Sequence, residues 1–113
     1  MNVSTGGLPV ERRIDGVEAR RATWAGTAVR VLDVAPGGDL QRLGTTTESG
    51  LCPVDHWGVV LEGRVDVRFA FGERETASAG DIFFWPALHR CWSEQGARLV
   101  EFSRSADLDA AAR

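Results

Sequence analysis

The stretch that decides the fold reads CPVDHWGVVLEG and runs from Cys52 to Gly63. A strict alternation of apolar and mostly charged residues follows directly after it. The apolar members of that alternation are Val65, Val67, Phe69 and Phe71. A period of two is typical of a β-strand with one buried face and one face in water. The stretch therefore predicts the central part of a β-sheet, with a break at Gly63.

Further short strands are predicted on both sides of this centre. They cover 17–25, 27–35, 75–79, 82–85 and 98–103, with turns at 36–39, 72–74 and 94–96 where glycine and polar residues gather. Residues 45–50 predict a surface loop, and 105–113 predict the only helix. Short strands at close spacing are typical of an all-β sandwich or barrel. We expect an N-terminal arm over 1–16, a barrel over 17–104 and a C-terminal helix or tail over 105–113.

Composition narrows the classes of protein to which the chain can belong. A length of 113 residues with 43% hydrophobic content suits one soluble globular domain. The net charge of -3 argues against nucleic acid as a partner, because phosphate neutralisation needs a basic excess. No apolar run is long enough to cross a bilayer, and no basic leader opens the chain, so we expect no membrane partner and a cytoplasmic location.

Two spaced patterns in the chain resemble the two motifs of the cupin superfamily. The first motif has two histidines one residue apart, a glutamate, six residues and a glycine. Aligned on Gly63, it places His56 at the glutamate, Cys52 at the second histidine and Gly50 at the first. The second motif has a glycine, five residues, a proline and a histidine; it matches from Gly80 to Pro86, with His89 or Cys91 at the histidine.

The opening stretch is also similar to a subgroup of small bacterial cupins with an altered metal motif. The resemblance implies an all-β fold, the cupin double-stranded β-helix or jelly-roll barrel, with a short C-terminal helix. It also implies that both motifs face the barrel interior. Side chains two or four residues apart on a strand share a face. We therefore expect Cys52 and His56 to point the same way into the barrel, and His89 and Cys91 likewise.

These residues form a candidate metal site, with Cys52, His56, His89 and Cys91 as its ligands. Thiolate and imidazole favour zinc, and iron or nickel are further candidates because many cupins use them. Four ligands make a closed site, whereas Cys52, His56 and His89 alone leave a position open. A site without metal is the alternative, since the usual three-histidine, one-glutamate set lacks two histidines and its glutamate here.

Other residues near the two motifs are candidates for a ligand pocket. Trp57, Trp85 and Trp92 flank the Cys and His positions and are expected to line it, although aromatic residues of small barrels also fill cores. Four arginines are candidates for a clamp that binds a ligand carboxylate: Arg30, Arg64, Arg68 and Arg90. Of these, Arg64 and Arg68 are expected to lie in solvent. Glu101 is a candidate general base, because it shares a face with Leu99 and Ser103.

The sequence predicts a small cupin that binds a divalent metal and a small organic molecule inside its barrel, without naming a reaction. The alternatives are a metal-free binding or sensor module and a dimeric interaction domain without catalysis. A nucleophilic Cys52 and a disulfide between Cys52 and Cys91 also remain open. A homodimer is expected, because small cupins commonly dimerise.

Overall fold

Strand β5 (His56–Phe69) is the centre of the molecule, as the alternating stretch predicts. Its first half pairs with β7 (Ile82–Trp85) and β9 (Ala97–Arg104), and its second half pairs with β6 (Arg74–Ser78) and β8 (His89–Ser93). Between the halves the register shifts near Val60 and Glu62, and Gly63 has a φ of 74°. The chain therefore bends at Gly63, where a break was predicted, and one strand serves two sheets.

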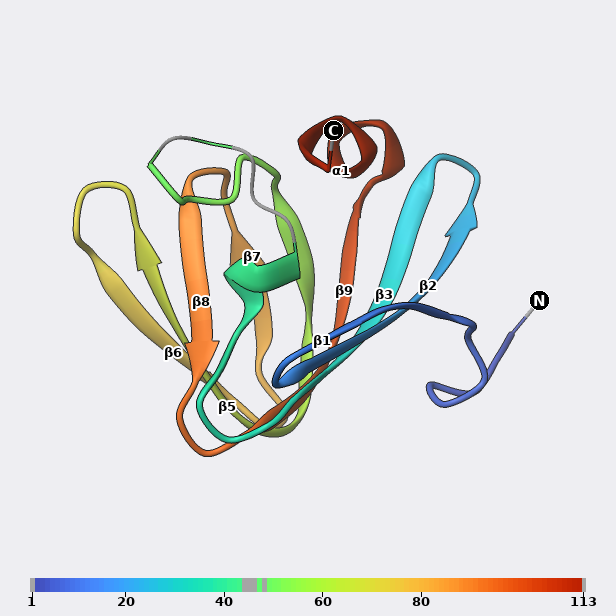
Figure 1. Cartoon of the computed structure of the whole chain (residues 1–113), viewed down its shortest axis with the longest axis horizontal. Coiled ribbons are helices and arrows are strands. Elements are labelled where there is room, and N and C mark those ends of the chain that lie inside the picture. The colour runs from blue at the N-terminus through green and yellow to red at the C-terminus, as the bar shows by residue number, and fades with distance from the viewer. Residues whose placement is uncertain (1, 44–46, 48, 113) are drawn as a thin grey trace.

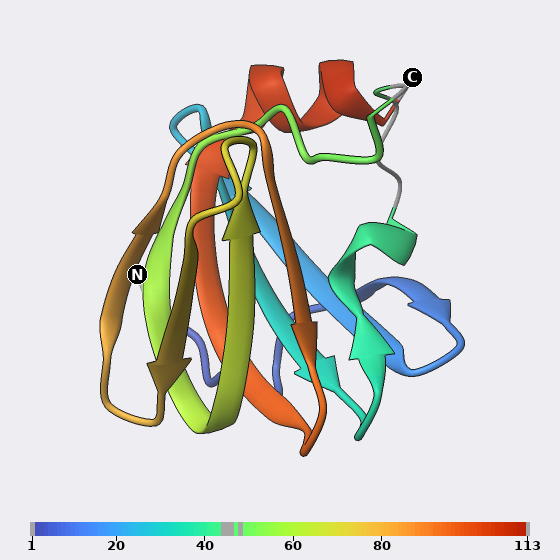
Figure 2. The ribbon, with the colours of Figure 1, turned by 90° about the vertical axis from the view of Figure 1, so that its left-hand side faces the viewer.

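The computed structural model of the chain describes residues 2–43, 47 and 49–112. In it the sheet curls into an antiparallel barrel whose two halves face each other (Figures 1 and 2). Its hydrogen-bonded order is β1-β2-β3-β9-β5-β8-β4, and β6 and β7 add to β5. The remaining elements are β1 (Val10–Ile14), β2 (Val17–Trp24), β3 (Thr27–Val34), β4 (Gly38–Asp39), the 3-10 helix η1 (Leu40–Leu43) and α1 (Ser105–Ala111). The all-β prediction and the short C-terminal helix are confirmed.

Two details differ from the expectation. The predicted arm over 1–16 contains β1, which pairs with β2 and so belongs to the sheet. Phe71 was predicted on the buried face of the central strand, but it is 96% exposed. The reason is that β5 ends at Phe69, where a turn closed by the Gly72 N–H on the Phe69 carbonyl oxygen leads into β6. Residues 45, 46 and 48 of the predicted loop, together with Met1, Gly44 and Arg113, lie outside the described residues.

The hydrophobic core fills the space between the two halves of the barrel. Its largest contributors come from both sheets: Leu32, Val60, Val65, Val67, Phe83, Trp85 and Leu99. Each strand sends alternate side chains inward, which is the pattern expected for a barrel with a filled interior. No helix within the described ranges is long and apolar enough to span a membrane.

Helix α1 lies across one end of the barrel (Figure 2). It is held there by Ser105, whose N–H and hydroxyl both donate to the Gly26 carbonyl oxygen, and by the ion pair of Asp109 with Arg21 at 2.7 Å. Its one buried side chain is Leu108. The helix thus covers the end of the barrel at which the motif residues gather.

Candidate functional site

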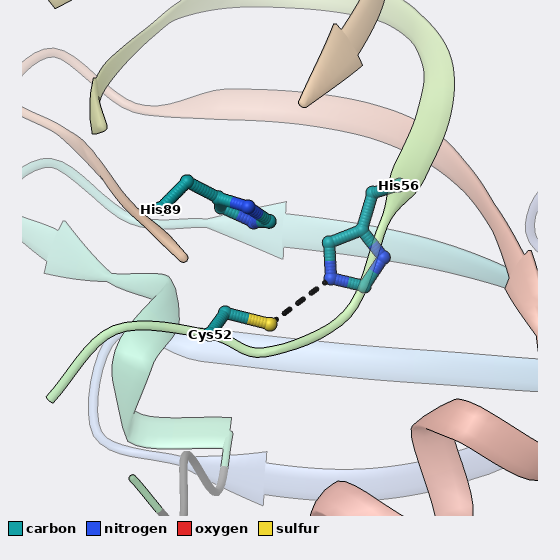
Figure 3. A group of neighbouring side chains, drawn as sticks. All are labelled: Cys52, His56 and His89. Carbon is teal, nitrogen blue, oxygen red and sulfur yellow. Dashed lines mark hydrogen bonds between the residues drawn. The ribbon is translucent and has the colours of Figure 1, made fainter. Parts of the chain in front are cut away.

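Cys52, His56 and His89 converge at the covered end of the barrel (Figure 3). One ligand atom from each lies within 4.8 Å of the other two. His56 opens β5 and His89 opens β8, and both are buried, with 3% and 2% of their surface exposed. Cys52 reaches them because it forms an isolated β-bridge with His89, in which the Cys52 N–H donates to the His89 carbonyl oxygen. The two motif halves therefore meet, as the resemblance implied.

The chain before His89 is held in an unusual conformation. Leu88 has a φ of 71°, in the left-handed region that non-glycine residues seldom adopt. Its N–H donates to the Cys52 carbonyl oxygen at 2.6 Å, which ties the turn to the opposite segment. Such strain persists only where the surrounding structure enforces it, and here it accompanies the turn that brings His89 into the barrel.

The hydrogen bonds of His89 decide which of its ring nitrogens carries the proton. Nδ1 lies 2.6 Å from the Pro86 carbonyl oxygen, and a carbonyl oxygen can only accept. Nδ1 is therefore the protonated nitrogen. The lone pair of Nε2 has no hydrogen-bond partner among the residues that the structure describes, so this nitrogen is left to bind a ligand.

His56 lies between the thiol of Cys52 and a buried charge pair. Its Nε2 is 3.3 Å from the Cys52 Sγ, and its Nδ1 is 2.5 Å from the Ser103 hydroxyl and 3.5 Å from Oε1 of Glu101. The same Glu101 oxygen accepts from Nε and Nη2 of Arg30, at 2.8 and 2.5 Å. Arg30 on β3 and Glu101 on β9 are direct partners in the register of those strands.

Burial shifts the titration of this cluster. It lowers the pKa of His56 to about 4, although the negative charge of Glu101 acts to raise it. It also lowers the pKa of His89. It raises the pKa of the Cys52 thiol and, more strongly, that of Cys91. For Glu101 burial acts to raise the pKa, but Arg30 and the two histidines outweigh it and hold the pKa below its usual range. Near neutral pH the site holds neutral imidazoles, thiols and one ionised carboxylate beside Arg30.

A cavity of about 50 Å³ adjoins the three side chains. Arg30 and Glu101 line it together with Cys52, His56 and His89. Its apolar walls come from β3, from the segment before β5, from η1 and from α1: Leu32, Val54, Leu40, Leu43 and Leu108. The cavity is therefore small, mostly apolar and provided with one charge pair.

The other predicted site residues lie around this cavity in different ways. Cys91 is buried and lines the cavity, but it lies outside the group of ligand atoms that converge. The three tryptophans predicted to line the pocket are not in its lining. Trp85 is a core residue that stacks on Phe83, and its ring centroid lies 6.0 Å from that of His89. Trp57 is partly exposed, and Trp92 lines separate hollows beside Arg74.

Of the four arginines considered for a clamp, Arg30 is the one buried in the cavity. Arg90 also lines the cavity and forms an ion pair with Asp39 at 2.6 Å. Arg64 and Arg68 do not line the cavity; Arg64 is half-buried, and Arg68 is exposed as predicted. The sequence did not single out Arg30 or its pairing with Glu101. A signal was present, since Arg30 is the one charged residue in the otherwise apolar run from Ala28 to Leu32, which is typical of a strand buried on both faces.

Comparison with known proteins supports the fold. No family model and no curated protein matches the chain. Solved structures do match, among them protein NMB1881 from Neisseria meningitidis, which is 26% identical with a TM-score of 0.60, over 77% of this chain and 82% of that one. An RmlC-like cupin from Shewanella frigidimarina is 19% identical with a TM-score of 0.68, over 91% and 88%.

A cupin superfamily protein from Desulfitobacterium hafniense is 15% identical with a TM-score of 0.63, over 86% of this chain and 94% of that one. These matches extend over nearly the whole of each cupin, so the likeness is one of complete domains. The chain is therefore a small protein of the cupin fold.

Proposed function

We propose that the chain binds a divalent metal ion through Cys52, His56 and His89, and a small organic molecule in the adjoining cavity. The observation that carries the proposal is the fixed orientation of His89. Its Nδ1 donates to the Pro86 carbonyl oxygen, while Nε2 has no partner among the described residues. Metal-binding histidines characteristically donate their other ring N–H to a carbonyl or carboxylate oxygen, which fixes the tautomer.

The rest of the donor set also suits a metal. Nδ1 of His56 faces the Ser103 hydroxyl and Glu101, which leaves Nε2 on the side of Cys52. One thiolate and two imidazoles are ligands that favour zinc, with iron and nickel as competitors. Because burial raises the pKa of Cys52, the ion must displace the thiol proton when it binds.

The surrounding residues define what the site can hold. A divalent ion with three protein ligands supplies Lewis-acid chemistry at its open position. Glu101 is ionised beside His56 and can accept a proton, and Arg30 holds that carboxylate in place. A cavity of about 50 Å³ is only a few times the minimum volume that holds one water molecule, so the organic ligand is small.

Metal analysis of protein purified without a histidine tag tests the proposal. We expect close to one equivalent of a transition metal, or its uptake on reconstitution with zinc or cobalt. His56→Ala and His89→Ala should abolish this uptake, whereas Cys91→Ala should keep it, because Cys91 lies outside the converging group. In the cobalt form, Cys52→Ser should remove the sulfur-to-cobalt charge-transfer absorption.

Less than about a tenth of an equivalent of any transition metal, unchanged on reconstitution, would contradict the metal site. If the Cys91→Ala variant instead lost its metal, Cys91 would be a fourth ligand. The metal would then have no open coordination position. Ligand-induced thermal stabilisation that a chelator does not remove would favour a metal-free binding pocket.

A further inference from the structure

Three arginines lie side by side on the outer face of the sheet formed by β8, β5 and β6. In the strand register, Arg68 of β5 is the direct partner of Arg90 on one side and of Arg74 on the other. The residues of opposite parity on the same strands are buried in the core: Val67, Ala77 and Cys91. The three arginine side chains therefore point away from the core. We call Arg68, Arg74 and Arg90 the arginine row.

The arginine row carries more positive charge than the fold neutralises. Arg90 forms an ion pair with Asp39. Arg68 and Arg74 form no ion pair with any residue that the structure describes. Like charges directly opposite each other on neighbouring strands destabilise a sheet, because their side chains lie close together. Two adjacent guanidinium groups are thus left without a counter-ion, and an anion bound between them would relieve their repulsion.

A hollow of about 360 Å³ lies over the arginine row. Besides the three arginines, its lining consists of Gly37, Asp39 and Trp92. Asp39 offsets one of the three positive charges, so the lining has an excess of two. Sites for small organic molecules have volumes from about 300 to 1,000 Å³. The hollow therefore has the charge of an anion site and the size of a site for a small molecule.

The adjoining hollow over the same sheet has the opposite charge. Two arginines line it, together with three carboxylates: Arg64, Arg74, Asp66, Glu75 and Glu94. Asp66 is the register partner of Trp92, so the negative charge begins one row away from the arginine row. The field of the sheet therefore places an anion over the arginine row and keeps it out of the next hollow.

Trp92 adds an aromatic wall to the hollow over the arginine row. The guanidinium carbon of Arg74 lies 5.9 Å from the centroid of the Trp92 ring, within the range of a cation–π contact. A stacked guanidinium is already ordered, and its planar group can donate two parallel hydrogen bonds to an oxyanion. Since Trp92 lines the hollow, it also offers apolar surface to the organic part of a ligand.

We propose that the arginine row binds the phosphate group of a small organic ligand. Arg68 and Arg74 donate to the phosphate oxygens, and Trp92 contacts the organic part. A phosphate monoester carries close to two negative charges near neutral pH, which matches the two guanidinium groups that lack a counter-ion. A carboxylate would neutralise only one. The site is distinct from the proposed metal site, because neither Arg68 nor Arg74 lines the cavity.

Calorimetric titration of the full chain with phenyl phosphate at pH 8 and low ionic strength tests the proposal. We expect a dissociation constant of about 1 mM or lower. Arg68→Gln and Arg74→Gln should each raise it at least about tenfold, since each removes charged donors to the phosphate. Inorganic phosphate should bind roughly threefold more weakly than phenyl phosphate, because it makes no contact with Trp92.

Arg64→Gln is the matched control, since Arg64 lies on the same strand and the same outer face but lines only the adjoining hollow. It should change the dissociation constant by less than about twofold. Arg90 is left intact because it also lines the cavity. All variants should keep the metal content of the wild type, since none belongs to the converging ligand group. Lost phosphate binding then reports on the arginine row alone.

Arg68→Gln should also have an effect on stability. In a buffer without phosphate it should raise the midpoint of thermal unfolding, because it removes the repulsion within the arginine row. Phenyl phosphate at about 10 mM should raise the midpoint of the wild type and leave that of Arg68→Gln unchanged. A residue that only supported the fold would show the reverse, with a lower midpoint in the variant.

Absence of binding by the wild type at about 10 mM phenyl phosphate would overturn the proposal. Equal weakening by Arg64→Gln and Arg68→Gln would reduce the effect to general attraction by a charged surface and contradict a site. Benzoate that binds as tightly as phenyl phosphate would refute the preference for a dianion. Tighter binding of a tetraglutamate peptide would assign the arginine row to an acidic peptide instead. Equal affinities for inorganic and phenyl phosphate would refute the role of Trp92.

Discussion

The buried pair of Arg30 and Glu101 is the residue-scale feature that links the cavity to the rest of the barrel. Two guanidinium nitrogens donate to one carboxylate oxygen, and the same oxygen lies 3.5 Å from Nδ1 of His56. Removing one partner of such a pair leaves an uncompensated charge inside the protein, whereas replacing both with apolar residues is often tolerated. A change at Glu101 should therefore alter both the free energy of unfolding and the orientation of the His56 ring.

We expect Glu101→Gln to lower the free energy of unfolding by roughly 3–5 kcal/mol, because it leaves the Arg30 charge buried without a counter-ion. Arg30→Met/Glu101→Leu should recover most of that loss while binding metal about 10–100-fold more weakly, since His56 loses its anchor. Urea unfolding and metal titration measure the two effects. The control is Glu18→Gln, which breaks an exposed pair with Arg13 and should cost at most about 1 kcal/mol. Equal losses in Glu101→Gln and Glu18→Gln would contradict the argument.

At the scale of elements, the bend of β5 and the position of α1 create the cavity. The bend depends on Gly63, because its φ is 74° and a Cβ there would lie 2.1 Å from the Gly96 carbonyl oxygen. Helix α1 lines the cavity with Leu108, which is buried although the helix is short. One element therefore curves the barrel around the site, and the other supplies part of the cavity wall.

Gly63→Ala should destabilise the protein clearly more than Gly72→Ala. Both glycines have positive φ, which costs alanine about 1–2 kcal/mol, but a Cβ at Gly72 meets no atom within 4 Å. The contact with the Gly96 backbone at Gly63 cannot be relieved by a side-chain rotation, so it adds to that cost. Denaturant midpoints of the two variants measure the difference. Similar midpoints would show that the bend tolerates a Cβ.

Leu108→Ala should lower the free energy of unfolding by about 2 kcal/mol, near the lower end for a leucine truncation because the residue lies at the rim of the cavity. It should also speed the transfer of bound metal to a chelator, since water gains access to the site. Stopped-flow chelation measures this rate. Ala106→Ser, an exposed change on the same helix, should leave both quantities unaltered. A chelation rate that does not change would mean that α1 does not control access.

On the scale of the whole molecule, the burial of the site couples folding to pH. His56 has a folded pKa of about 4, and His89 is lowered as well, so both are neutral in the folded chain where the unfolded chain would protonate them. A group whose folded pKa is depressed contributes stability above its unfolded pKa, and that contribution falls as the pH drops toward the folded value. For histidine the window lies between about 6.5 and about 4.

The metal-free protein should therefore lose stability as the pH falls from about 6.5 to about 4. His56 alone accounts for a loss of about 3 kcal/mol, and His89 acts in the same direction. Urea unfolding at a series of pH values, with chelator present, measures the slope. In His56→Gln the slope should become shallower over this window. A stability that stays level down to pH 4 would contradict the neutral, buried state of the two histidines.

The local sequence predicted most of the fold and the main site residues, for reasons that act over short distances. The alternation from Val65 onward defines a strand and its faces, and glycine marks the turns. The barrel type was implied by the resemblance of the stretch from Cys52 to Gly63 to a cupin motif. Strand periodicity also predicted that Cys52 and His56 share a strand face, but the chain bends between them, and Cys52 reaches His56 through its isolated β-bridge with His89. The convergence of Cys52, His56 and His89 follows from these features once the two motif halves meet.

Other features depended on how distant strands align. Arg30 and Glu101 are far apart in the sequence and become neighbours only through the β3–β9 register, and a shift of one residue would send either side chain to the opposite face. Trp57 and Trp85 flank the site in sequence, yet strand parity and packing send one outward and the other into the core. Periodicity along a strand is set by neighbouring residues, whereas register between strands is set by the packing of the whole barrel.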